Sequence, residues 1–181
     1  MSEHRPDLYD LIDRICRLAA VPGWEDGLSP AEASVLRYLA HANRFSRRPV
    51  DISDYLALTR LTVNRTLNAL AKKGLLGLGP ADWDAQTVLA SLTDDGLALA
   101  RHEPLIPIAA ETLSPVESAL MIEGLTKTLR AVIMRRGHRS FGLCATCKHH
   151  ERRSESGWCR LVKVDLSLAD AEQLCREHET T

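Results

Sequence analysis

Apolar residues recur at helical spacing near the start of the chain. Charged side chains separate them, and they fall on one face of a helix. These apolar positions are Leu8, Leu11, Ile12, Ile15, Leu18 and Ala19. Pro22 and Gly23 follow and do not continue the helix. The pattern therefore predicts an amphipathic helix over residues 7–20.

In two longer stretches, the first residues form N-terminal capping signals that predict helices. In "LSPAEASVLRYLAHA" a serine, a proline at the first helical position and a glutamate three residues after the serine form a capping box. This helix starts after Ser29 and is expected to reach about Ala42. The same signature opens "LSPVESALMIEGLTKTLRAVIMRR" at Ser114 and predicts a long helix to about Arg136.

A pair of shorter helices lies between these two. Residues 52–58 favour a short helix with Asp51 or Ser53 as its cap. Thr59 can cap a second helix that runs through Lys73, and the glycine after it supplies a left-handed stop. Two helices joined by so short a turn are typical of a helix-turn-helix.

A β-hairpin is predicted directly after the second helix. Residues 75–78 and 87–92 have strand character, and the stretch between them, "GPADWDAQ", contains turn-forming residues. Helix, tight turn, helix and hairpin in this order describe a winged helix-turn-helix. The predicted fold class is therefore mainly α with a small β-hairpin wing.

The composition is typical of an ordinary soluble protein. Hydrophobic residues make up 45% of the 181 residues, charged residues make up 26%, and no stretch of 18 apolar residues occurs. Charged side chains interrupt the first residues, unlike a secretory leader. We therefore expect a cytoplasmic protein with reduced cysteines and without a membrane segment. No phosphate-binding glycine loop or nucleophile elbow is present, which argues against an enzyme.

The net charge of −1 conceals a basic segment. From residue 44 to residue 73 there are seven arginines and lysines against two aspartates, whereas residues 74–134 are acidic. A basic patch on a near-neutral protein is typical of a surface that binds a polyanion, although many such patches are only solvated.

The second helix of the pair carries residues suited to reading DNA. In a helix-turn-helix the start of this helix enters the major groove. Arg60 and Arg65 can bind guanine, and Asn64 can bind adenine. The Thr62 hydroxyl can bind a base or a phosphate. Nearby basic residues are better placed for the phosphate backbone: Arg44, Arg47, Arg48, Lys72 and Lys73. Double-stranded DNA is therefore the expected partner.

The segment "ISDYLALTRLTVNRTLNALAKKGLL", followed by "VLASLTDDGLALA", resembles the MarR family of bacterial transcription regulators. Thr93 and Gly96 stand where that family has a Leu-Thr-x-x-Gly signature. The resemblance implies an obligate homodimer whose N- and C-terminal helices interlock, with two winged lobes on a pseudo-palindromic operator. It also implies repression that a small-molecule effector or oxidation relieves.

With this resemblance the chain divides into three parts. Residues 1–27 and 97–140 are expected to form a helical dimerisation region. Residues 28–96 are expected to form the winged helix-turn-helix domain, and residues 141–181 a cysteine-rich metal-binding module.

The predicted wing departs from the family pattern. Where the family commonly has an Asp-x-Arg-Arg-like run, this chain has "DWDAQ", from Asp82 to Gln86, without a basic residue. Phosphates repel acidic side chains, so this wing is not expected to enter the minor groove. Trp83 is expected to pack on its own lobe. The acidic wing leaves an alternative open, an interaction module that does not bind DNA.

Four of the five cysteines lie in the last part of the chain. Their spacing is Cys144-x2-Cys147-x11-Cys159-x15-Cys175, in which a Cys-x-x-Cys turn and two later cysteines can supply four ligands to one tetrahedral centre. We expect Cys159 on a short strand, "WCRLVKV", and Cys175 on a final helix that Ser167 caps.

Metal binding is the preferred interpretation of these four cysteines. Residues 141–181 contain few large apolar side chains, so a small knob beside the dimerisation helices would need a cross-link to fold. Zinc is the preferred ion, with an iron–sulfur cluster as the alternative. A redox disulfide pair and inert thiols are the other interpretations. The metal would be structural, or it would be a sensor that controls DNA binding.

The remaining metal-binding residue types are assigned other roles. His149, His150 and His178 could substitute as ligands, but with four cysteines present they are expected to lie at the surface or beside the ligands. Cys16 lies beside an apolar stripe and is expected to be a small buried side chain. Four thiolates would also close a zinc coordination sphere, which leaves no open position for catalysis.

Overall fold

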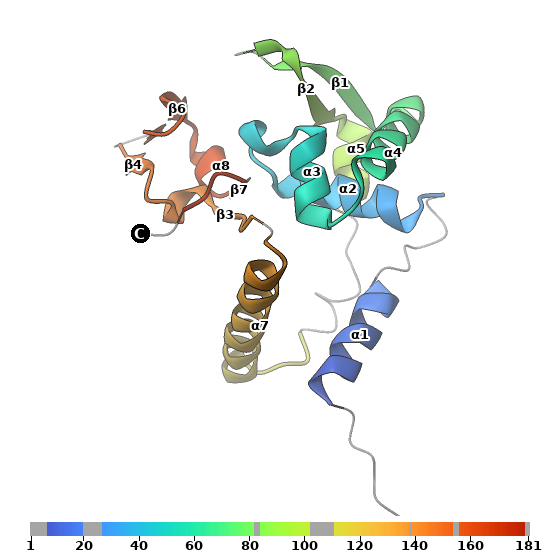
Figure 1. Cartoon of the computed structure of the whole chain (residues 1–181), viewed down its shortest axis with the longest axis vertical. Helices are drawn as coiled ribbons and strands as arrows, with labels where there is room; N and C mark the ends of the chain where they lie inside the picture. Colours follow the sequence, from blue (N-terminus) through green and yellow to red (C-terminus); the bar gives the residue numbers. More distant parts are fainter. Residues whose placement is uncertain are drawn as a thin grey trace, which may run out of the picture.

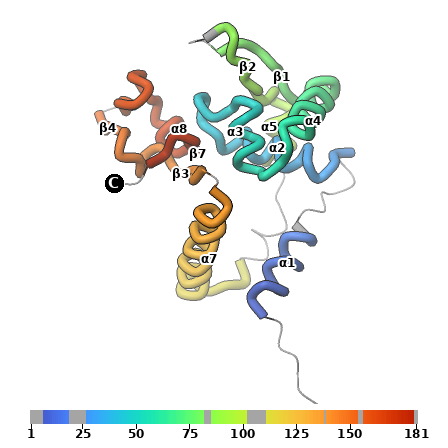
Figure 2. The backbone as a smooth tube through the Cα atoms, viewed as in Figure 1, coloured from blue at the N-terminus to red at the C-terminus, as the bar shows by residue number. Residues whose placement is uncertain are grey.

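The computed structural model describes residues 7–19, 27–81, 84–101, 111–137, 139–153 and 156–179. These residues form a winged lobe, two helices at one side of it, and a small C-terminal module (Figure 1). Figure 2 shows that the C-terminal segment, in red, returns to the side of the winged lobe. No described helix is both long enough and apolar enough to cross a membrane.

The winged lobe has the element order that the sequence predicts. Its elements are α2 (Pro30–His41), the 3-10 turn η2 (Arg44–Ser46), α3 (Pro49–Leu56), α4 (Arg60–Lys72), β1 (Leu76–Ala81), β2 (Asp84–Leu92) and α5 (Asp94–Ala100). β1 and β2 form an antiparallel hairpin in which Leu76 pairs with Leu92. The prediction of a mainly α fold with a hairpin wing is confirmed.

One apolar core holds the winged lobe together. Its most deeply buried side chains come from α2, α3 and α4: Leu36, Leu39, Ile52, Val63, Leu67 and Leu70. Burial of each such side chain contributes about 1.5–3 kcal/mol. Tyr38 extends this core through ring contacts with Tyr55 and Phe141, at centroid distances of 4.7 and 6.2 Å. Phe141 begins the C-terminal module, so the module shares an aromatic contact with the lobe.

The caps predicted for α2 and α4 are confirmed. The Ser29 hydroxyl accepts from the Glu32 backbone N–H at 3.3 Å, and the Glu32 carboxylate accepts from the Ser29 backbone N–H at 2.7 Å. The Thr59 hydroxyl accepts from the Thr62 N–H at 3.1 Å, which fixes the start of α4. After α4, Gly74 adopts a φ of +72°, which only glycine takes readily.

The predicted start of α3 is wrong. The helix begins three residues earlier, at Pro49, because proline fits the first helical position, where no backbone N–H is needed. Asp51 is then the third helical residue, and its carboxylate accepts from the Arg48 backbone N–H at 3.0 Å. The Ser53 hydroxyl donates to the Leu58 carbonyl at 2.7 Å and therefore serves the other end of the helix.

The hairpin is longer than predicted. Gly79 and Pro80 had the character of turn residues, yet both lie in β1, where Pro80 pairs with Val88. A two-stranded sheet has only edge strands, and an edge strand tolerates a proline. Asp82 and Trp83 lie outside the described residues, as does the side chain of Asp84. The expectations for the acidic wing therefore remain predictions.

Thr93 and Gly96 join the hairpin to α5. The Thr93 hydroxyl donates to the Gly74 carbonyl at 2.9 Å and accepts from the Gly96 N–H at 3.1 Å. A Cβ atom on Gly96 would lie 1.9 Å from the Leu75 carbonyl oxygen. The glycine is therefore required because the backbone of α5 touches the backbone at the base of the wing.

Two helices lie apart from the core of the winged lobe. α1 (Leu8–Ala19) and α7 (Pro115–Arg136) match the predicted amphipathic helix and the predicted long helix. α7 has the predicted capping box at Ser114 and ends at Gly137, with a φ of +65°. No residue of α7 is buried in the described chain.

The C-terminal module is built from short strands and one helical turn. Its elements are β3 (Gly142–Leu143), the 3-10 turn η3 (Cys144–Thr146), β4 (His150–Arg152), β5 (Gly157–Cys159), β6 (Val164–Leu166), α8 (Leu168–Ala171) and β7 (Leu174–Cys175). β4, β5 and β6 form an antiparallel sheet, and β3 pairs with β7.

Two predictions for this module are wrong. The stretch "WCRLVKV" is not one strand, because β5 and β6 are joined by a turn in which Lys163 has a φ of 56°. Cys175 lies on β7 and not on a helix, because α8 ends after about one turn and the Leu174 carbonyl accepts from the Asn43 N–H at 2.9 Å. Ser167 does cap α8 as predicted.

The close contact at Gly96 predicts that adding one methyl group there lowers the stability of the fold. Gly96→Ala should lower the free energy of unfolding by about 1–3 kcal/mol, because the Leu75 carbonyl must move to admit the Cβ. Gly77→Ala is the control, since nothing lies within 4 Å of its Cβ position. Urea denaturation measures both variants. Equal stabilities would contradict the close approach.

Candidate nucleic-acid interface and cysteine site

α4 presents one buried side and one exposed side. Val63, Thr66, Leu67 and Leu70 face the core. The predicted base-reading residues Arg60, Asn64 and Arg65 are exposed, and Thr62 is half-buried, with its hydroxyl 2.8 Å from that of Thr59. Asn68 is also exposed, one turn after Asn64. Sequence reasoning missed Asn68, although its spacing from Asn64 places it on the same face.

Two of the predicted phosphate-binding arginines have partners within the lobe. The Arg47 Nε donates to the Ala42 carbonyl at 3.1 Å, and burial lowers the pKa of Arg47. The Arg48 guanidinium donates to both carboxylate oxygens of Asp51 at 2.9 Å. Both side chains are half-buried, so each would have to keep these bonds while it reached a phosphate.

The remaining basic residues of the segment differ in exposure and partners. Lys72 is exposed at the end of α4. Lys73 lies 2.8 Å from the Glu32 carboxylate and donates to the Gly27 carbonyl at 3.0 Å. Arg44 is exposed, and its guanidinium donates to the backbone carbonyl of Asp165 in the C-terminal module at 2.6 Å. The basic segment therefore faces both solvent and the module.

The module docks on η2 and α3, a contact that the sequence did not predict. Ala42 forms a parallel bridge with Leu174. The Arg176 backbone N–H donates to the Ser46 hydroxyl at 2.9 Å. The Arg176 guanidinium lies 2.7 Å from the Asp54 carboxylate and 3.2 Å from that of Asp51. The module, expected as a knob beside the helical region, is thus attached to the winged lobe.

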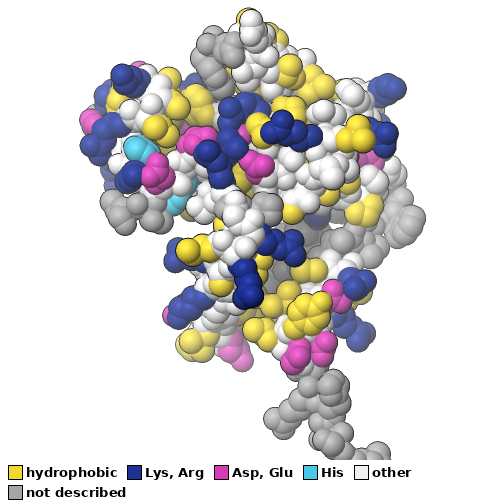
Figure 3. Space-filling view, viewed as in Figure 1, with side chains coloured by type: hydrophobic (Ala, Val, Ile, Leu, Met, Phe, Trp, Pro, Cys, Tyr) yellow, Lys and Arg dark blue, Asp and Glu magenta, His cyan; other side chains and the backbone are white. Residues whose placement is uncertain are grey.

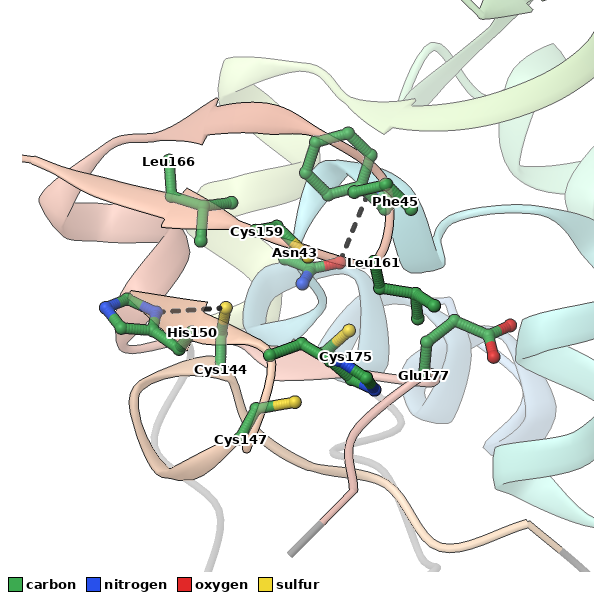
Figure 4. Close-up of a pocket in the computed structure, with 12 residues that line it drawn as sticks. Asn43, Phe45, Cys144, Cys147, His150, Cys159, Leu161, Leu166, Cys175 and Glu177 are labelled. Carbon is green, nitrogen blue, oxygen red and sulfur yellow. Dashed lines mark hydrogen bonds between the residues drawn. The ribbon is translucent and has the colours of Figure 1, made fainter. Parts of the chain in front are cut away.

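The four C-terminal cysteines line one small cavity. Cys144 comes from η3, Cys147 from the residue that ends this turn, Cys159 from β5 and Cys175 from β7. In Figure 4 their side chains extend toward a common space. The cavity volume is about 20 Å³, enough for roughly one water-sized sphere. The four cysteines that the spacing argument singled out therefore line the same cavity, and their role as metal ligands stays a prediction.

No disulfide joins the described cysteines. All five cysteines, each of which the structure describes, are free. Within the described ranges, no three Cys, His, Asp or Glu side chains are gathered as a metal-binding group. Cys16 is exposed on α1 and not buried as expected, because no other described element covers that helix in the single chain.

The cavity disfavours negative charge on sulfur. Burial, followed by the three neighbouring thiols, raises the pKa of Cys144 to about 12. Burial also raises the pKa of Cys175. The thiols of Cys144 and Cys175 therefore ionise readily only if positive charge enters the cavity.

The histidines take positions beside the thiols. The Cys144 Sγ lies 3.6 Å from the His150 Nδ1, and both side chains line the cavity. His149 lines it too, with its Nε2 3.1 Å from a Glu179 carboxylate oxygen. His178 contacts the Thr146 hydroxyl at 2.9 Å and is not among the residues that line the cavity.

Asn43 is the residue at this site that sequence reasoning missed. It lies between α2 and η2, is 1% exposed, and lines the cysteine cavity. Its amide oxygen accepts from the Phe45 N–H at 3.2 Å. No motif signals it or Arg176, because both act through contacts more than 100 residues away along the chain.

Comparisons with known proteins agree with this geometry. Residues 26–82 match the MarR family, whereas no curated protein matches the chain. The fold is similar to that of MepR from S. aureus in complex with DNA, with a TM-score of 0.57 and 22% identity over 70% of this chain and 99% of the MepR chain.

A second relative gives the same picture. The reduced form of MarR from E. coli has a TM-score of 0.55 and 23% identity, and the alignment covers 70% of this chain and 99% of MarR. Almost the whole of each relative is therefore matched, while about 30% of this chain lies outside the alignment. Residues 26–82 thus match the MarR family, the fold is similar to that of these winged helix-turn-helix transcription regulators, and about the last third of the chain adds a region outside that fold.

Proposed function

We propose that this protein is a MarR-like transcription regulator that binds operator DNA as a homodimer and carries a metal ion in its C-terminal module. The observation that carries the DNA-binding part is the exposed face of α4, where Arg60, Asn64 and Arg65 stand clear of the core. MarR-family proteins are transcription regulators and not enzymes.

DNA binding rests on the match between this helix face and the chemistry of the major groove. Two guanidinium groups and one amide near the start of the helix suit guanine and adenine edges. The similar MepR chain has been solved in complex with DNA. The half-buried Arg47 and Arg48 contribute less than their charge suggests, so the base contacts of α4 and the exposed Lys72 supply most of the affinity.

The first test separates base reading from phosphate contact. An operator is first selected from random duplex DNA with the wild-type protein. Asn64→Ala should then weaken operator binding by about 1–3 kcal/mol, roughly 5- to 150-fold in Kd, and relax specificity at one base pair. Lys72→Gln should weaken all duplexes equally and lower the salt slope by about 1.

Fluorescence anisotropy at several salt concentrations measures both effects. Arg101→Gln, an exposed arginine at the end of α5, is the control and should bind as the wild type does. Failure to select any duplex, or binding that does not depend on salt, would favour the interaction module that does not bind DNA.

Dimer formation accounts for the exposed apolar faces of α1 and α7. On α7 the exposed large side chains include Val116, Leu120, Ile122, Leu125, Leu129 and Val132. Figure 3 shows hydrophobic side chains gathered over the two helices. A soluble chain seldom leaves so long an apolar surface in water. A second copy that pairs these helices would cover it, as the family resemblance implies.

The second test alters the apolar face of α7. Leu125→Lys with Leu129→Lys places two charges on one side of the helix and should yield monomers, because the charges cannot be buried at a dimer contact. Lys127→Ala, on the opposite side, is the control and should remain dimeric. Sedimentation equilibrium measures the mass. A wild-type monomer at micromolar concentration would contradict the dimer.

The metal site consists of the four cavity cysteines. A single cation would supply the positive charge that favours ionisation of the Cys144 and Cys175 thiols. The cavity admits about one water-sized sphere, which favours one zinc ion over a larger iron–sulfur cluster. Binding draws the thiols together around the ion, and a cytoplasmic location would keep them reduced. When bound, the ion cross-links η3, β5 and β7.

The third test counts the metal. Protein purified without oxygen should contain about one zinc per chain, and Ser in place of Cys144, Cys147, Cys159 or Cys175 should lower that content. Cys16→Ser is the matched control and should retain the ion. Full metal content in all four variants would show that the site is elsewhere. If the purified protein were brown and absorbed visible light, the site would hold an iron–sulfur cluster and not zinc.

A further inference from the structure

Asn43 places an orphan hydrogen-bond donor in the cysteine cavity. The residue belongs to the winged lobe and is 1% exposed. Its Nδ2 is a buried nitrogen without a hydrogen-bond partner among the described residues. In Figure 4 the amide nitrogen is directed into the space between the cysteine side chains, while the amide oxygen is held by Phe45.

An unsatisfied buried amide needs an explanation. Leaving such a donor without an acceptor costs about 1–3 kcal/mol, and folded proteins rarely contain one. The cavity that Asn43 lines contains four sulfur atoms, and sulfur accepts hydrogen bonds weakly as a thiol and strongly as a metal-bound thiolate. The Asn43 side chain already opposes the effect of burial on the pKa of Cys175, and a metal-bound thiolate would give its N–H the strong acceptor that it lacks.

Cys175 is the thiolate that Asn43 can serve best. The residue before it, Leu174, accepts a backbone hydrogen bond from Asn43, and the residue after it, Arg176, donates one to Ser46. One bond to the Asn43 backbone and one to the Ser46 hydroxyl thus hold the residues on either side of Cys175 close to Asn43. Cys144 lies in η3 and Cys147 directly after it, and among the described residues no hydrogen bond joins this segment to Asn43.

We infer that the metal site is shared between the two parts of the chain: Asn43 of the winged lobe donates its Nδ2–H to the Cys175 thiolate when the ion is bound. The inference rests on the proposed metal site and adds a residue to it. Asn43 is a positioning residue and does not touch the ion. Outer partners of this kind orient ligands and tune metal affinity.

Sharing the site connects metal loading to the lobe. Loading fixes Cys175, and the next residue, Arg176, holds the carboxylates of Asp51 and Asp54 on α3. Since α3 packs against α4, the ion stabilises the support of the DNA-reading helix. The ligand is a divalent cation that binds thiolates. The part of the winged lobe that its binding stabilises is the segment from η2 to α3.

The first arm of the test measures zinc affinity by competition with a chelator. Asn43→Asp has the same shape and keeps the oxygen that accepts from Phe45, but it replaces the N–H donor with a negative oxygen. Zinc affinity should fall about 10- to 100-fold. Asn68→Asp, the same change on exposed α4, should leave the affinity unchanged. Equal affinity in Asn43→Asp and wild type would overturn the inference.

The second arm follows hydrogen exchange in the full chain with and without zinc. Zinc should slow exchange in residues 44–56 as well as in the module. Arg176→Gln should retain zinc while the protection of residues 49–56 no longer depends on it. Zinc-dependent protection confined to residues 141–179 would overturn the inference, even if Asn43→Asp folds poorly. Wild-type protein that binds no zinc would instead refute the proposed metal site.

Discussion

The carboxylate of Asp51 is fully buried at the start of α3, and it has one positive partner nearby in the sequence and another near the C-terminus. Arg48, three residues before it, donates two bonds of 2.9 Å. Arg176, near the C-terminus, lies 3.2 Å away. Removal of one partner from a buried ion pair typically destabilises a protein by about 3–5 kcal/mol. The winged lobe and the module therefore form one structural unit.

This arrangement changes how the basic segment should be understood. Arg44 and Arg48 contact the module, and Arg47 is held by the lobe backbone. Much of the positive charge before α3 is thus used in internal contacts. The surface left for DNA is narrower than the charge pattern suggested and centres on α4. A narrow recognition surface agrees with a wing that lacks basic residues at its predicted tip.

The sequence predicted those parts of the fold that depend on neighbouring residues. Caps at Ser29, Thr59 and Ser114 were correct because a cap is a contact over three residues. The start of α3 was missed because Asp51 serves as the third helical residue and also as a buried counter-ion. The strand at Cys175 was missed because its backbone partners, Gly142 and Asn43, are remote in sequence.

In the candidate sites too, the sequence predicted what depends on neighbouring residues and missed what depends on remote ones. Cysteine spacing sufficed to place four thiols around one cavity, since a Cys-x-x-Cys turn fixes two of them locally. Helical spacing sufficed to place Arg60 and Asn64 on the exposed side of α4. Asn43 and Arg176 could not be recognised, because their roles exist only after the C-terminal segment has folded back onto the lobe.

The return of β7 to η2 has a mechanical consequence. α7 is followed by β3, and β3 pairs with β7. β7 in turn is hydrogen-bonded to the winged lobe, which precedes α7 in the sequence. The backbone thus closes a ring that is completed by hydrogen bonds. A lobe attached to α7 at one point can rotate relative to that helix, whereas a second attachment restricts the rotation. In a dimer built on α7, this restriction would fix the separation of the two recognition helices before they meet DNA, which lowers the entropy lost on binding.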